Sequence, residues 1–263
     1  MVVIDLSKLY SFKVRTIQKL SKPNIITYFG VKLKLDYNRP FNAYAYSSKR
    51  YETKILKKFI SIVGNGDIVF DLGADQGIFS LVASKIVGDG IVLAVEPSDS
   101  RRKLLKENIE LNQFKNIRII PNPISNKHKP IKFYEQNCSC IKGNNSNLIY
   151  KDAVTVDYLS SLYGFPNVVK IDVEGFEKNV IEGMVKTLKN YPVLILELHP
   201  IYDVKDCVWC IKKLNNLNYD NFIYMERNEL INPALFDEEL VQTLYEKQMK
   251  NGMPHILIKR SWN

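Results

Sequence analysis

From residue 67 onward, short apolar segments alternate with amphipathic ones. DIVFDLG (67–73) precedes QGIFSLVASKIV, and GIVLAVEPS (90–98) precedes DSRRKLLKENIELNQ. Further apolar segments lie at 116–125, 167–175 and 192–200. Apolar strands separated by amphipathic helices indicate a parallel sheet covered by helices on both faces. The sequence therefore predicts an α/β fold with one large sheet.

Two parts of the chain fall outside this alternation. We expect an N-terminal extension over residues 1–50, a helix followed by a hairpin near 24–37, that packs on a core domain of residues 51–263. Within the core, short β-like pieces around an Asn-, Gly- and Ser-rich loop predict a β-rich insertion at about 128–160. HILIKR, near the C-terminus, is expected to be the last strand.

Composition limits the class of protein. Hydrophobic residues make up 46% of the 263 residues, enough for a sizeable core. The net charge of +9 suits an anionic partner, or a surface of dispersed lysines, because no block of five like charges occurs. No segment has the ~18 consecutive apolar residues of a membrane span, and the N-terminus does not resemble a signal peptide. We therefore expect a cytoplasmic protein without a membrane span.

The four cysteines form a C-x-C pair, Cys138 and Cys140, and a C-x-x-C pair, Cys207 and Cys210. Such pairs occur in zinc sites. However, Cys207 falls on the apolar stripe of a predicted helix, with Cys210 beside it. We therefore expect buried free thiols.

Candidate site residues follow the apolar strands, because ligands of such sheets bind outside the carboxyl ends of the strands. These residues are Asp71, Gly73, Glu96, Asn122, Asp172, Glu174, Glu197 and His199. Carboxylates dominate this set, and it contains no lysine or arginine. A ligand with phosphates would need basic side chains or helix N-termini around it. The carboxylates therefore favour a nucleoside that carries a positive charge.

The turn after the first core strand is Gly73-Ala-Asp-Gln-Gly77, a G-x-x-x-G pattern. It is neither G-x-G-x-x-G, because Asp75 replaces the second glycine, nor a P-loop. S-adenosylmethionine, with its sulfonium and ammonium groups, fits better than a dinucleotide. Gly73 and Gly77 would let the backbone approach the methionine moiety, and the helix start near Gln76 would take its carboxylate.

Glu96 follows Gly73 by about 20 residues, the spacing at which an acid accepts the ribose hydroxyls. This spacing also fits NAD. The alternative is that Glu96-Pro97 simply caps the following helix. Asn122, Pro123 and Ile124 are candidates for adenine contacts, or form an ordinary turn.

Four segments in order resemble the FkbM family of S-adenosylmethionine-dependent methyltransferases: VFDLGADQGIFS, VLAVEPS with LLKENIELN, VVKIDVEGFEKNVIEGM and LILELHP. The resemblance covers about residues 50–200. It implies a class I, Rossmann-like fold with a seven-stranded, mostly parallel sheet whose last strand is antiparallel. It also implies methyl transfer to a hydroxyl of a sugar, a glycan, a lipid-linked acceptor or a natural product. Glu52 matches an acidic position of the family and is expected to contact the cofactor or the acceptor.

Together, these arguments predict a cofactor site. Its members are Glu52, Asp71, Gly73, Ala74, Gln76, Gly77, Glu96, Pro97, Asn122, Pro123 and Ile124.

Asp172 and Glu174 are the first candidates for catalysis, since residues two apart in a strand face the same way. Either one can be the general base for a hydroxyl or can position the acceptor. Glu197 and His199 form a second such pair. All four also have structural alternatives, such as capping a helix or ending a strand. Mg²⁺ or Mn²⁺ can bind Asp172, Glu174 and Glu197 or His199, but we expect no metal.

Two other functions remain open at this stage. The net charge of +9 is compatible with an RNA methyltransferase, although no RNA-binding module is recognisable. A non-catalytic nucleotide-binding protein on the same fold is the second alternative.

Overall fold

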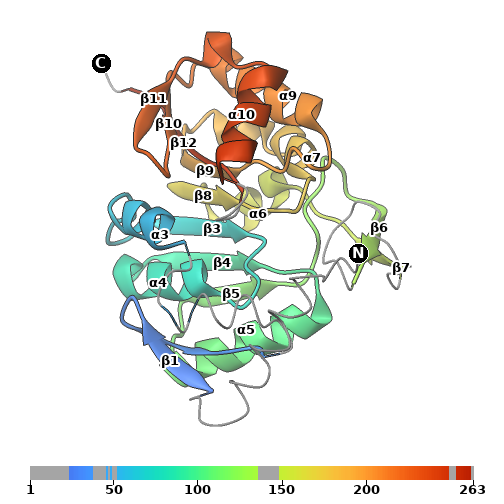
Figure 1. The fold of residues 1–263 in the computed structure, drawn as a ribbon. Coiled ribbons are helices and arrows are strands. Elements are labelled where there is room, and N and C mark those ends of the chain that lie inside the picture. Colours follow the sequence, from blue (N-terminus) through green and yellow to red (C-terminus); the bar gives the residue numbers. More distant parts are fainter. Residues whose placement is uncertain are drawn as a thin grey trace, which may run out of the picture.

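The computed structural model describes residues 24–37, 46, 48, 52–135, 148–248 and 253–261. Its centre is an eight-stranded sheet with the order β11-β10-β12-β9-β8-β3-β4-β5 (Figure 1). The predicted helix in residues 1–22 lies outside the described residues, as do Cys138 and Cys140.

Five neighbouring strands of this sheet are parallel, and their arrows point the same way in Figure 1. They are β3 (Ile68–Leu72), β4 (Ile91–Val95), β5 (Ile117–Ile120), β8 (Val168–Ile171) and β9 (Val193–Glu197). The last strand, β12 (His255–Lys259), is antiparallel to both β9 and β10 (Asn221–Tyr224). A mostly parallel sheet with an antiparallel last strand is therefore confirmed.

The expected number of seven strands was wrong. The additional strand is β11 (Glu229–Ile231), which pairs antiparallel with β10 at the edge of the sheet. A turn at Asn228, whose φ of 58° is left-handed, sends the chain back along β10. Three residues are a weak sequence signal for a strand, because alternation needs a longer window.

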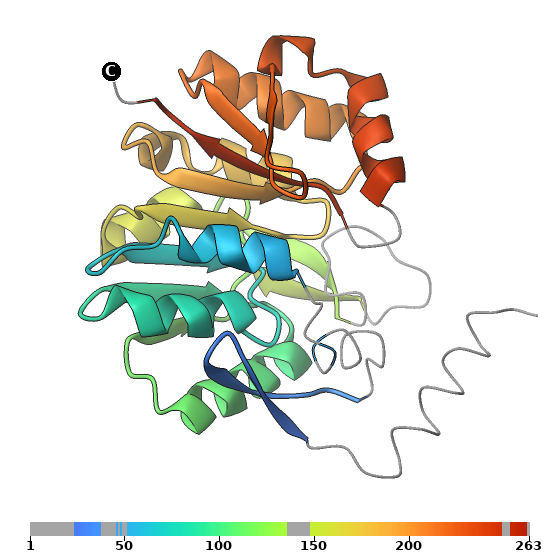
Figure 2. The ribbon, with the colours of Figure 1, turned by 60° about the vertical axis from the view of Figure 1, so that its left-hand side comes forward.

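Helices cover both faces of the sheet (Figure 2). One face carries α3 (Thr53–Ile60), α4 (Ile78–Val87) and α5 (Asp99–Asn112). The other carries α6 (Val156–Tyr163), α7 (Glu177–Glu182), α9 (Val204–Asn216) and α10 (Glu238–Gln248). The short helix α8 (Val185–Leu188) lies between α7 and β9, and a 3₁₀ helix (Pro233–Leu235) lies between β11 and α10. A hydrophobic core lies on each face of the sheet, and alternate residues of a strand pack into opposite cores. In β9, Ile195 packs on the face with α3, α4 and α5, and Leu194 and Leu196 pack on the other face.

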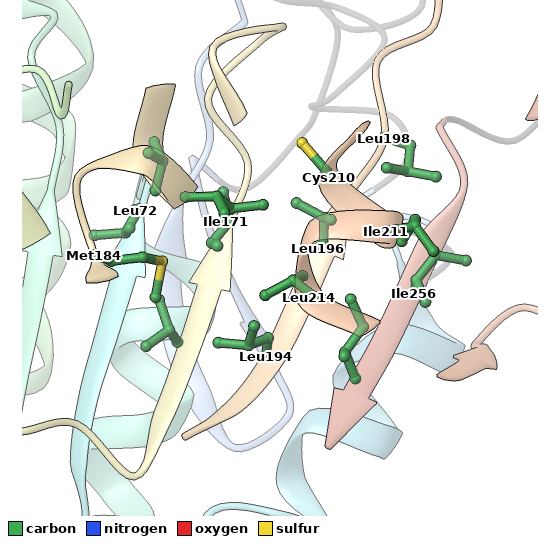
Figure 3. Close-up of a cluster of buried hydrophobic side chains, with 14 of the residues drawn as sticks. Leu72, Ile171, Met184, Leu194, Leu196, Leu198, Cys210, Ile211, Leu214 and Ile256 are labelled. Carbon is green, nitrogen blue, oxygen red and sulfur yellow. The ribbon is translucent and has the colours of Figure 1, made fainter. Parts of the chain in front are cut away.

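The core beneath α9 joins this helix to the sheet. Figure 3 shows Cys210, Ile211 and Leu214 of α9 beside Leu196 and Ile256 of the sheet. Cys207 and Cys210 are free and buried, as predicted, and burial raises the pKa of both thiols. They act as small apolar groups of the core.

Two small antiparallel sheets lie beside the main one. The first is a hairpin of β1 (Ile25–Tyr28) and β2 (Val31–Lys34), and β2 contacts α5. The second pairs β6 (Pro130–Tyr134) with β7 (Leu148–Asp152). The region expected to be β-rich up to residue 160 is helical from Val156, where the Thr155 hydroxyl caps α6 by accepting from the Tyr158 N–H.

The boundary drawn between an extension and a core domain stays a prediction. None of the described helices is long and apolar enough to cross a membrane.

Gly73 connects β3 to the segment after β8. Its φ is +85°, and a Cβ there would lie 1.7 Å from the backbone oxygen of Asp172. Gly66 has a similar φ of +82° but open space around it. Only glycine allows the close approach that brings the ends of β3 and β8 together.

We expect Gly73→Ala to reduce the free energy of unfolding more than Gly66→Ala does. Both variants carry left-handed strain of about 1–2 kcal/mol, and overlap with a backbone oxygen adds about 2 kcal/mol or more to Gly73→Ala. Urea unfolding of both variants measures the difference. Equal losses would show that the close approach at Gly73 is unimportant.

Candidate functional site

A pocket opens at the carboxyl ends of β3, β4 and β8, where the sequence placed its candidates. Seven of the predicted site residues line it: Gly73, Glu96, Pro97, Pro123, Ile124, Asp172 and Glu174. The parallel strands end at one edge of the sheet, so residues distant in the chain meet there.

The pocket also contains residues that the predicted site lacked. They are Asp75, Val95, Arg101, Phe133, Val173 and Phe176. Phe133 comes from β6, so the small sheet beside the core contributes an aromatic ring to the pocket wall. Apolar and aromatic groups of this kind suit the faces of a nucleoside base.

The charge of the pocket is predominantly negative. Asp75, Glu96, Asp172 and Glu174 contribute carboxylates, whereas Arg101 contributes the one cationic side chain among the described lining residues. Arg101 Nε lies 3.5 Å from Asp75 Oδ1, so part of its charge is already compensated. This imbalance favours a ligand with positive charge.

Glu96 is held by backbone donors. Its Oε2 accepts from the Asp75 N–H and its Oε1 from the Ser98 N–H, both at 2.8 Å. Burial raises the pKa of Glu96 to about 7, against the opposing effect of Arg101. The carboxylate is thus fixed at the end of β4 and keeps lone pairs for further donors.

Several predicted cofactor residues are not among those that line the pocket. Asp71 is buried and accepts from the Ser80 hydroxyl at 2.6 Å. The Ala74 N–H donates to the Val95 carbonyl, and the Asn122 amide donates to the Asp152 carbonyl.

Gln76 and Gly77 shape the turn in the same indirect way. Gln76 is buried, and its carbonyl accepts from the Asn108 amide at 2.9 Å. Gly77 precedes α4 with a φ of +94°, and a Cβ there would meet Leu105.

A buried lysine sits beneath the pocket. Lys170 Nζ donates to Asp172 Oδ2 at 2.9 Å and lies 4.8 Å from the centre of the Phe79 ring. In the register of β3 and β8, Lys170 is the partner of Asp71. Burial opposes ionisation of Asp172, but Lys170 and His199 outweigh it and hold the pKa of Asp172 well below its usual value.

His199 is enclosed by carboxylates. Its Nδ1 lies 2.9 Å from Glu177 Oε1, and its Nε2 lies 3.7 Å from oxygens of both Asp172 and Glu174. Burial disfavours the charged imidazole, but Glu177 and Glu197 prevail and raise the pKa of His199 to about 10. A protonated His199 is a counter-ion for these acids and is unsuited to accept a proton.

Glu174 is the most accessible acid of this group. It has a left-handed φ of 54°, and its side chain is 35% exposed. Burial and the nearby Asp172 raise the pKa of Glu174 to about 7. A non-glycine residue in this conformation is uncommon and is often found at functional sites.

A second depression, here called the basic hollow, adjoins this network. Its wall carries four basic side chains, Lys54, Lys57, Arg227 and Lys247, and it also contains Glu52, Glu226 and His255. Glu52 therefore lies here and is not part of the first pocket. His255 Nε2 is 3.2 Å from Glu197 Oε2, and Glu197 Oε1 is 3.9 Å from His199 Nε2. Glu197 thus connects the basic hollow to the first pocket.

A profile described as the Methyltransferase FkbM domain matches residues 71–228, more than half of the chain. The chain belongs to the FkbM methyltransferase family. This finding confirms the family and the fold class predicted from the sequence.

Individual relatives of this FkbM protein are more distant. The hexuronic acid methyltransferase AglP of Haloferax volcanii is 26% identical over 172 residues, which are 60% of this chain and 66% of that protein. The ribosomal protein L11 methyltransferase of Caldanaerobacter subterraneus is 36% identical over 73 residues, 27% of this chain and 23% of that protein. The matches thus span less than two thirds of either relative.

Solved structures are similar at a lower level. The FkbM methyltransferase of Methylobacillus flagellatus aligns with a TM-score of 0.47 and 14% identity, over 86% of this chain and 56% of that one.

Two residues of the FkbM protein that the predicted site lacked, Lys170 and His255, could have been found from the sequence. Lys170 is a charged residue inside an apolar parallel strand, where a lysine is almost never buried without a partner. His255 opens the antiparallel strand β12, which places it opposite Glu197 at the site edge of the sheet. The other two residues, Arg101 and Glu226, have no such sequence signal, because only the folded chain brings them to the site.

Lys170→Met should destabilise the protein by about 3 kcal/mol or more, since it removes the buried cation that faces both Asp71 and Asp172. Lys178→Met is the matched control, because Lys178 makes a 2.8 Å pair with Asp206 that is half-exposed. We expect that control to lose under about 1 kcal/mol. Denaturant unfolding measures both values. Similar small losses in the two variants would contradict the organising role of Lys170.

Proposed function

We propose that this FkbM protein transfers a methyl group from S-adenosylmethionine to a hydroxyl of an anionic acceptor, such as a glycan that contains a hexuronic acid. The observation that carries the first part is the charge of the pocket, with four carboxylates and one guanidinium. The basic side chains of the basic hollow are separate support for an acceptor that carries negative charge.

The residues of the pocket fit this cofactor. Glu96 would accept the ribose hydroxyls, and Ile124 and Phe133 would pack against adenine. Gly73 lines the pocket without a side chain, so its backbone can approach the ligand closely. When bound, S-adenosylmethionine supplies a methyl group on a cationic sulfur. Asp172 and Glu174 would face that charge.

Glu174 is the proposed general base. It lines the pocket and is more exposed than the Lys170-bound Asp172. Its pKa of about 7 suits removal of a hydroxyl proton near neutral pH. Asp172, kept ionised by Lys170, would orient His199 and the acceptor.

The basic hollow is the proposed acceptor site. Its four basic side chains suit a carboxylate or a phosphate, and Glu197 connects it to the acids of the first pocket. AglP, the archaeal relative, is named for a hexuronic acid acceptor, which carries such a carboxylate.

Glu174→Gln should lower turnover at saturating cofactor by ~10²-fold or more, because the amide cannot accept the proton. Below pH 7 the wild-type carboxyl is protonated, so wild-type turnover should rise through pH 7 and then level off. Burial of Glu174 sets this midpoint together with the charged neighbours Asp172, His199, Arg101 and Glu197.

In this experiment, initial rates between pH 5.5 and 9 give the profile for each variant. Glu239→Gln, on the exposed face of α10, is the control and should match the wild type. Asp172→Asn should lower turnover while keeping a rise with pH. A Glu174→Gln enzyme with the wild-type profile would exclude Glu174 as the base.

The acceptor is tested with matched sugars. A glucuronide and the corresponding glucoside, each incubated with protein and S-adenosylmethionine, differ in one carboxylate. We expect a product heavier by one methyl group from the glucuronide, with kcat/KM at least ~10-fold above that of the glucoside. Lys54→Gln combined with Arg227→Gln should reduce this preference.

Other outcomes separate the alternatives. Equal use of both sugars would contradict an anionic acceptor. Methylation of RNA, with binding that weakens steeply with salt, would support an RNA methyltransferase. Cofactor binding without transfer to sugars, glycans or RNA would support the non-catalytic alternative.

A further inference from the structure

We infer that Glu52, Glu197 and His255 form a binding site for a divalent cation at the floor of the basic hollow. One atom from each residue, two carboxylate oxygens and an imidazole nitrogen, lies within 4.8 Å of the others. Ligands on opposite sides of such an ion are about 4 Å apart, so small side-chain rotations complete the site.

The three ligands come from separate elements. Glu52 precedes α3 with a left-handed φ of 42°, Glu197 ends β9, and His255 opens β12. Glu197 and His255 are register partners in the antiparallel pair, which places them side by side. The backbone conformation of Glu52 is uncommon for a non-glycine residue.

His255 is oriented as a metal ligand. Its Nδ1 lies 2.9 Å from Glu226 Oε1, which also accepts the His255 N–H at 2.9 Å. A carboxylate at Nδ1 leaves Nε2 facing the site, the arrangement that commonly supports metal-bound imidazoles. The side chain is 4% exposed, and its Nε2 lies 3.2 Å from Glu197 Oε2 without the alignment of a hydrogen bond.

The surrounding acids favour positive charge. Burial disfavours the charged imidazole, but Glu197, Glu226 and Glu52 raise the pKa of His255 well above its usual value, and a bound metal ion would take the place of that proton. Three carboxylates, those of Glu52, Glu197 and Glu226, surround the His255 ring. Among the described residues, Glu52 Oε2 and Glu226 Oε2 are also buried without a hydrogen-bond partner. Lys170 is close, but its ammonium donates to Asp172. Buried carboxylates are otherwise paired or coordinate metals.

A second group, Asp172, Glu174 and His199, is also close enough to hold an ion. There, however, Lys170 already donates to Asp172, and His199 Nδ1 is hydrogen-bonded to Glu177. The proposed cofactor brings its own positive charge to that group. The inferred ion therefore belongs to the Glu52 site.

Two carboxylates and one imidazole suit Mn²⁺ or a similar first-row ion. Glu52 and His255 line the basic hollow, so the remaining coordination positions face it. There the ion can hold water or oxygen atoms of an acceptor. Cation binding itself does not depend on the proposed methyl transfer.

The test is a titration of the full chain with Mn²⁺, without S-adenosylmethionine, followed by electron paramagnetic resonance of the free ion. We expect one site, and at least ~10-fold weaker binding in Glu52→Gln and in His255→Gln. Glu174→Gln and Glu229→Gln are controls for the neighbouring group and for surface acids, and should bind as the wild type does. Mn²⁺ should also raise the thermal unfolding midpoint of the wild type but not of Glu52→Gln.

Absence of Mn²⁺ binding to the wild type at millimolar concentration would overturn the inference. So would binding that Glu174→Gln abolishes and Glu52→Gln retains. Should His255→Gln fail to fold, Glu52→Gln decides, because circular dichroism can confirm its fold. Calorimetry with S-adenosylmethionine in metal-free buffer tests the cofactor pocket separately, so failure of either proposal leaves the other identifiable.

Discussion

The ion pair between Lys170 and Asp172 is the interaction on which the rest of the site depends. A lysine in the middle of a buried strand requires a partner, and Asp172 supplies it at 2.9 Å. This pair keeps Asp172 ionised next to His199, whose imidazole then neutralises Glu177 and the acids around it. The fold thus holds several buried and half-buried carboxylates close together at one edge of the sheet.

The geometry of the acids adds to this arrangement. Glu52, Asp75 and Glu174 each have a left-handed φ, an uncommon conformation that here turns their carboxylates toward the two depressions. Gly73 permits the close contact between β3 and the segment after β8. Local backbone strain and a buried charge network therefore act together to position the site.

Much of this was predictable from sequence, because apolar periodicity determines the strands and parallel strands align their carboxyl ends. The sequence placed Glu96, Asp172 and Glu174 at this edge of the sheet, and all three line the pocket. Asp71 and Gln76 were placed near the ligand, but the pleat turns the first into the core and the turn buries the second. Arg101 and Glu226 could not be predicted, since no local pattern shows which helix turn or loop will face the pocket.

The central claim is that the pocket at the ends of β3, β4 and β8 binds a cationic nucleoside. Calorimetric titration of the protein with S-adenosylmethionine and with NAD, in the same buffer, tests it most directly. The account predicts one site for S-adenosylmethionine, at least ~10-fold weaker in Glu96→Gln, and no measurable binding of NAD. Tighter binding of NAD than of S-adenosylmethionine would contradict it.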